Sequence, residues 1–134
     1  MNTGIHALAG AALGALLQDR RKALLAGVAA HLPTDLLPHY HLSDTGEVLT
    51  AIASLVFVGL RYGGDSPEFA GAIGALLPDL EVVANRLHLL PENSQVFPTH
   101  RGLHGHRQSH PTTEILLALG SLLILESRHR PKPP

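Results

Sequence analysis

Runs of apolar residues rich in Ala and Leu, each ended by Gly, Pro or a polar cluster, recur along this chain. The clearest runs are residues 5–17, 48–60 and 115–125. Ala and Leu are among the strongest helix formers, and no segment shows the alternation of apolar and β-branched residues that is typical of a strand. The sequence therefore predicts an all-α fold, a single compact bundle of about five helices with a His-rich loop before the last helix.

Composition excludes several classes of function. The chain has no Cys, so disulfides, thiolate metal ligands and a Cys nucleophile are ruled out. The formal net charge is −1 over 134 residues, and the only basic cluster is Arg20, Arg21 and Lys22. A nucleic-acid interface needs more clustered positive charge than this, so no nucleic-acid partner is expected. In contrast, the ten His residues equal Lys and Arg combined, and His is the commonest metal ligand.

Turn-forming residues divide the chain into five expected helices. Thr3 is the expected N-cap of the first, Pro33 is expected to break the second, and Ser66-Pro67-Glu68 opens the fourth, which meets Pro78. The expected helices cover residues 3–17, 22–31, 47–60, 67–78 with a kinked continuation over 81–90, and 112–127. Residues 1–127 are therefore expected to form one helical metal-binding domain, and residues 128–134 a Pro-rich basic tail.

The N-terminus lacks the basic segment and cleavage site of a secretory signal. Each apolar run is shorter than the roughly 20 residues of a membrane-spanning helix, which favours core helices. The run over residues 48–60 is nevertheless apolar on nearly all sides. The expected location is therefore cytoplasmic or membrane-associated, and a membrane surface or a second copy of the chain is a candidate partner.

The segment His31-Leu32-Pro33-Thr34-Asp35 is the strongest local signal for a metal site. Residues four apart lie on the same face of a helix, so His31 and Asp35 can bind one ion. Nitrogen and oxygen ligands suit zinc, manganese or iron. Pro33 complicates this interpretation, because it removes the hydrogen bond to Ala29. The alternative is an Asp that caps a helix beside a surface His.

A second signal is the segment over residues 97–106, which contains His100, His104 and His106. Three imidazoles in a Gly-containing loop can point to one centre, and the adjacent Arg101 suits an anionic substrate such as a phosphate. An ordinary polar loop is the alternative.

Two more segments complete the candidates. Asp79 and Glu81, in Leu77-Pro78-Asp79-Leu80-Glu81, can supply one metal ligand and one general base, although Asp79 can instead cap a helix. His6 lies on the apolar face of the first helix, where a lone His is more often a core residue than a ligand.

Taken in order, these motifs resemble a family of small helical bacterial proteins described as membrane-associated metal-dependent hydrolases, which are distantly similar to zinc-dependent phospholipase C. The resemblance spans nearly the whole chain, through short motifs. It implies a ligand set of six side chains: His6, His31, Asp35, Asp79, His100 and one of His104 or His106. The spacing fits a longer form of the late motif through His106, whereas Glu81 stands where Asp is commoner.

The sequence thus predicts a metal-dependent hydrolase, acting on a small-molecule or lipid phosphoester with a divalent metal, zinc first and manganese or iron next. Glu81 is the candidate base, and Arg101 the candidate group that stabilises developing charge. The main alternative is a non-enzymatic metal-binding module, structural or membrane-associated, that assembles with itself. Another is a bundle whose His residues bind haem.

Overall fold

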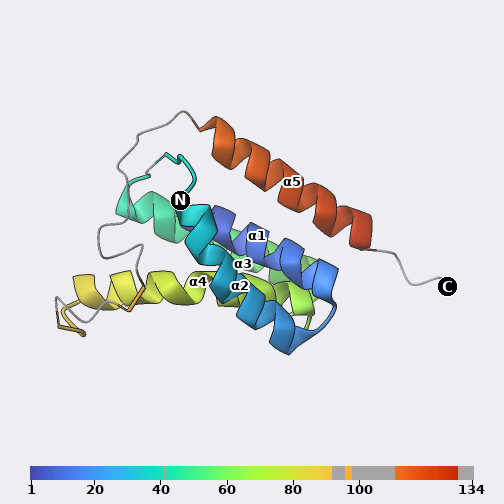
Figure 1. Ribbon diagram of the computed structural model, residues 1–134, viewed down its shortest axis with the longest axis horizontal. Coiled ribbons are helices and arrows are strands. Elements are labelled where there is room, and N and C mark those ends of the chain that lie inside the picture. The colour runs from blue at the N-terminus through green and yellow to red at the C-terminus, as the bar shows by residue number, and fades with distance from the viewer. Residues whose placement is uncertain (41, 92–95, 98–110, 130–134) are drawn as a thin grey trace.

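The computed structural model describes residues 1–40, 42–91, 96–97 and 111–129. Within these ranges the regular structure consists of five α-helices and includes no strand, which confirms the all-α bundle (Figure 1). The helices are α1 Thr3–Leu17, α2 Arg20–Asp35, α3 Asp44–Tyr62, α4 Pro67–Arg86 and α5 Thr112–Arg128. Helix α1 packs against each of the other four, and α2 packs on α1 and α4.

The helix ends follow local chemistry. The side chains of Asp19, Ser43 and Ser66 each accept a backbone N–H of the helix that follows, as N-caps do. Pro67 occupies the first turn of α4, as predicted. The expected cap at Thr3 is wrong, because Asn2 accepts the N–H of Gly4 and Thr3 already belongs to α1.

The two internal prolines do not break their helices, which corrects the expected ends near Pro33 and Pro78. Helix α2 continues through Pro33 to Asp35, and the Thr34 hydroxyl lies 2.8 Å from the Ala30 carbonyl and 2.9 Å from that of His31. This side-chain hydrogen bond ties Thr34 to the preceding turn of the helix, although it does not reach the Ala29 carbonyl that loses its partner at Pro33. Pro78 is buried within α4, which runs to Arg86.

Small residues form the interior of the bundle. The buried apolar residues are mostly Ala, joined by Val58, Leu76 and Leu125. Large apolar side chains lie outside instead: Leu60 is 85% exposed and Leu123 72% exposed. Helix α3 is long and apolar enough to cross a membrane by length and composition, and only 6% of its apolar window is buried.

Carboxylates from two other helices bind the start of α1. The backbone N–H of Asn2 donates to Glu114 of α5, and the N–H of Thr3 donates to Glu47 of α3, at 2.9 and 2.7 Å. These carboxylates satisfy N–H groups that a helix start leaves without partners, and they complement its positive dipole end. The position of α1 is therefore fixed by both neighbours.

Candidate metal centre

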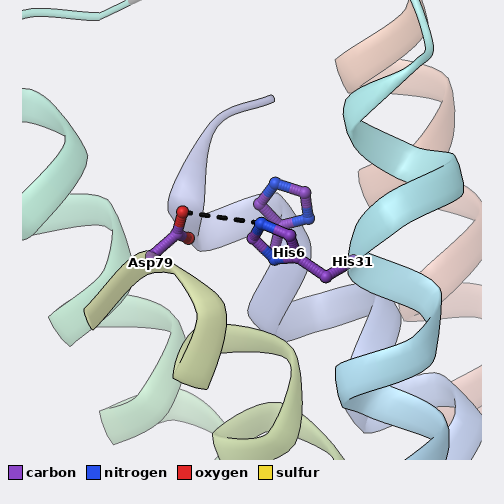
Figure 2. Close-up of side chains that lie close together, drawn as sticks. All are labelled: His6, His31 and Asp79. Carbon is purple, nitrogen blue, oxygen red and sulfur yellow. Dashed lines mark ion pairs between the residues drawn. The ribbon is translucent and has the colours of Figure 1, made fainter. Parts of the chain in front are cut away.

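Three helices bring two imidazoles and a carboxylate together. His6 comes from α1, His31 from α2 and Asp79 from α4, and one potential ligand atom of each lies within 4.8 Å of the others (Figure 2). The two imidazoles are buried and stacked, with ring centroids 4.1 Å apart. The ion pair drawn in Figure 2 joins His31 Nε2 to Asp79 Oδ1 at 3.7 Å. These three residues form the candidate metal cluster.

Glycines allow the three helices to approach closely enough to form this cluster. The Gly71 carbonyl of α4 lies against both Gly10 of α1 and Gly27 of α2, so a Cβ at either position would overlap it. His6 lies one turn before Gly10, and His31 lies one turn after Gly27. The close glycine contact therefore sets the distance between the two imidazoles.

The hydrogen bonds of His6 indicate which ring nitrogen carries a proton. Nδ1 lies 2.9 Å from the Thr34 hydroxyl, whose proton is directed at backbone carbonyls. The hydroxyl can therefore accept from Nδ1–H, and Nε2 then presents a lone pair to Asp35 Oδ1 at 2.9 Å. A cation between Nε2 and the carboxylate would make this contact attractive, whereas without a cation the single proton of the neutral ring is on Nε2 and is donated to Asp35 Oδ1.

His31 has the same arrangement with a different partner. Its Nδ1 lies 2.8 Å from the backbone carbonyl of Ala75, which can only accept, so Nδ1–H donates. Nε2 then faces Asp35 Oδ2 at 3.2 Å as well as Asp79. Metal-binding His residues commonly donate their second N–H to a carbonyl or another oxygen in this way.

Asp35 joins the two imidazoles. Its Oδ1 contacts His6 and its Oδ2 contacts His31, and the Met1 nitrogen lies 3.0 Å from Oδ1. The structure therefore brings four predicted ligands together: His6, His31 and Asp79 within 4.8 Å of one another, and Asp35 in contact with both imidazoles.

Burial and the contacts among the four side chains set the charges of the site, where the Met1 ammonium is also paired with Asp35. Burial lowers the pKa of His6 to about 4, so its imidazole is neutral at pH 7. Burial acts to raise the pKa of Asp35, but hydrogen bonds with His31 and His6 hold it well below its ordinary value. Burial raises the pKa of Asp79 to about 6. For His31, hydrogen bonding to Asp35 and the nearby carboxylates outweigh burial and raise the pKa.

This donor set fits a zinc-type ion. Two imidazole nitrogens with one or two carboxylate oxygens are ligands found in catalytic zinc sites. Ligand atoms around a tetrahedral zinc lie about 3.5 Å apart, so the present separations need only small side-chain movements.

The remaining predicted residues do not join this cluster in the described part of the chain. Glu81 accepts the backbone N–H groups of Val96 and Phe97, the second at 3.1 Å. The Phe97 ring in turn lies edge-on to His31, with centroids 6.0 Å apart. His100, Arg101, His104 and His106 lie outside the described residues, so their roles stay predictions.

The sequence did not single out one group beside the site. Thr34 contacts His6, and its position directly after Pro33 was the available signal.

Comparisons with protein-family models, with curated proteins and with solved structures give no match to this chain. The resemblance drawn from its short motifs is therefore not tested by them, and the functional argument rests on the geometry above.

Asp79→Asn is expected to stabilise the metal-free protein at pH 8. The carboxyl loses its proton near pH 3.8 when unfolded and near pH 6 when folded, so stability falls as the pH rises from about 4 to 6 and stays low above that. With the side chain 24% exposed, the gain is about 2 kcal/mol at pH 8, and about half of that at pH 5. Urea denaturation at pH 8 and at pH 5 measures this gain in the free energy of unfolding. Asp65→Asn, at a 98% exposed position, is the control, and an equal gain there would contradict the argument.

Proposed function

We propose that this protein is a metal-dependent hydrolase that binds a divalent ion, preferentially zinc, through His6, His31 and Asp79. Asp35 supplies a fourth oxygen or holds both imidazoles in place. One observation carries the proposal: two buried imidazoles, each with an oxygen partner at Nδ1, direct Nε2 toward the Asp35 carboxylate, and Asp79 lies within 4.8 Å of both.

Access to the site favours catalysis over a purely structural role. A cleft of about 890 Å³ is lined by both Asp35 and Asp79, so a substrate can reach the carboxylates. Structural zinc sites are closed, whereas catalytic sites keep a position open. The ion would supply Lewis acidity, polarising a phosphoryl oxygen and making water more acidic. The chain itself orients the ligands through Thr34 and the Ala75 carbonyl.

His100 and Arg101, which lie outside the described residues, remain part of the proposal. Phe97 contacts His31, and three residues span at most about 11 Å. His100 follows Phe97 by three residues, which supports His100 as a further ligand and Arg101 as a group for the developing charge. Glu81, which binds the segment at Val96 and Phe97, is retained as the candidate base.

Zinc-loaded protein is expected to hydrolyse bis(para-nitrophenyl) phosphate, and removal of zinc with a chelator is expected to abolish the activity. Asp35→Ala and Asp79→Ala should each lose bound zinc and lower the rate by at least about 100-fold, measured by mass spectrometry of the metal and by release of nitrophenolate. Zinc retained by both variants would rule the centre out. Full zinc occupancy without turnover would favour the alternative, a non-enzymatic metal-binding module.

A membrane surface as the working location is supported by the outward-facing apolar side chains. On α3, Val56 is 53% exposed and Leu60 85% exposed, and α5 exposes Leu116 and Leu123 at 64% and 72%. Exposed apolar residues that gather into a patch are typical of a contact with a membrane or a partner. Helix α3 is the described helix best suited to lie against lipid.

The protein is expected to float with phospholipid vesicles in a density gradient. The double variant Val56→Glu with Leu60→Glu should lower the bound fraction more than about tenfold, since each buried apolar side chain contributes about 1.5–3 kcal/mol. Leu25→Glu, a 69% exposed position on α2, is the matched control. Equal flotation of the double variant and the wild type would exclude α3 as the contact.

A further inference from the structure

The cleft beside the metal cluster has apolar walls made by two helices. Val48, Ile52 and Leu55 of α3 face it, as do Leu80 and Val83 of α4 and Leu87 directly after that helix. Both sets follow the spacing of one helix face. Several of these side chains are more than half exposed, including Ile52 at 53% and Leu87 at 62%. The walls thus form a furrow of apolar surface open to an occupant.

The same cleft has a polar region. Thr3, Asp35 and Asp79 all line it, and the two carboxylates belong to the candidate metal centre. An ion pair between Asp44 and Arg86, at 2.5 Å, connects the two walls. Apolar walls and metal-binding carboxylates therefore share one cavity, which suits a ligand with an apolar part and a polar part.

The size and the charge of the cleft indicate which class of ligand it can bind. The cleft has a volume of about 890 Å³, which is less than a third helix as long as its walls would fill at a diameter of about 10 Å. A single hydrocarbon chain fits this space. The polar region carries negative charge, so an anionic head group would be repelled without a cation and attracted with one.

We propose that the cleft binds a single-chain amphiphile, with its hydrocarbon chain between α3 and α4 and an anionic phosphate head group at the metal. This inference rests on the proposed metal centre and names the substrate class: phosphate esters of a long unbranched chain. Each added methylene is expected to lower the Kd of the ligand about fourfold, because each buried methylene contributes nearly the same free energy of binding.

The test is calorimetric titration of zinc-loaded protein with octyl, decyl and dodecyl phosphate below their micelle concentrations. Kd should fall about 15-fold for each two carbons, and binding should be lost after chelation. Decyl maltoside, a neutral ligand with the same chain, should bind with and without zinc. Ile52→Asp in the wall should weaken all of these ligands, whereas Leu119→Asp on α5, with the same 53% exposure outside the cleft, should not.

The outcomes separate the two proposals. Suppose that the protein binds zinc but the Kd of the alkyl phosphates does not depend on chain length, or that Ile52→Asp binds these ligands as well as the wild type does. Either result would contradict the amphiphile site and leave the metal centre supported. Absence of zinc binding, measured in the same samples, would overturn the metal centre and with it the head-group contact, even if decyl maltoside still bound.

Discussion

Replacing His31 with Ala is expected to lower the affinity for zinc by more than about 100-fold, because loss of a ligand should exceed the 10–100-fold effect of losing a group that merely orients one. The variant removes Nε2 from the point where Asp35 and Asp79 meet. Competition with a chromophoric chelator measures the affinity. His88→Asn is the matched control: His88 is exposed and has a positive φ of 56°, which Asn tolerates. Unchanged affinity in His31→Ala would contradict the assignment.

A second pair of variants separates zinc binding from folding. Thr34→Val removes the hydroxyl that accepts the Nδ1–H of His6 but leaves every ligand in place. Zinc affinity should fall about 10–100-fold, whereas Thr34→Ser, which keeps the hydroxyl, should bind nearly as well as the wild type. Equal losses in both variants would indicate a packing effect and contradict the role given to the hydrogen bond.

Gly71→Ala is expected to destabilise the protein by about 3 kcal/mol or more. A Cβ at Gly71 would overlap the backbone carbonyl of Gly10, and neither main chain can move aside without separating α1 from α4. Overpacking of this kind typically costs about 1–3 kcal/mol, and more where backbone is the obstacle. Urea denaturation followed by circular dichroism gives the free energy of unfolding.

The control for this variant is Gly120→Ala on α5. A Cβ there would meet no atom within 4 Å, and Ala is a better helix former than Gly by about 0.5–1 kcal/mol. The same substitution is therefore expected to stabilise one helix and disrupt the other. If Gly71→Ala were as stable as the wild type, the close approach of α1 and α4 would not be what holds the metal cluster together.

Local signals were sufficient to predict the helical class, but not how the prolines are accommodated. Ser66 and Pro67 predicted the start of α4 correctly, since capping depends only on adjacent residues. Pro33 was expected to break its helix, and Pro78 was expected to introduce a kink. Helix α2 continues past Pro33 with the Thr34 hydroxyl bonded to the preceding turn, and Pro78 is buried inside the bundle. The burial of Pro78 depends on packing between helices, which adjacent residues do not indicate.

The candidate site was predictable only where its residues are close in sequence. His31 and Asp35 are one helical turn apart, so their pairing could be read from spacing. The approach of His6 and Asp79 could not, because it depends on how α1 and α4 cross at Gly10 and Gly71. Only the motif resemblance indicated His6 as a ligand.

The carboxylates at the start of α1 have a consequence for assembly. This helix has no acidic residue in its own first turn and takes that charge from Glu47 and Glu114, which lie 44 and 112 residues away along the chain. Contacts so distant in sequence require long loops to close, which slows folding. We expect the helix that carries His6 to reach its final position only once α3 and α5 have docked, so that zinc binding would report formation of the native state.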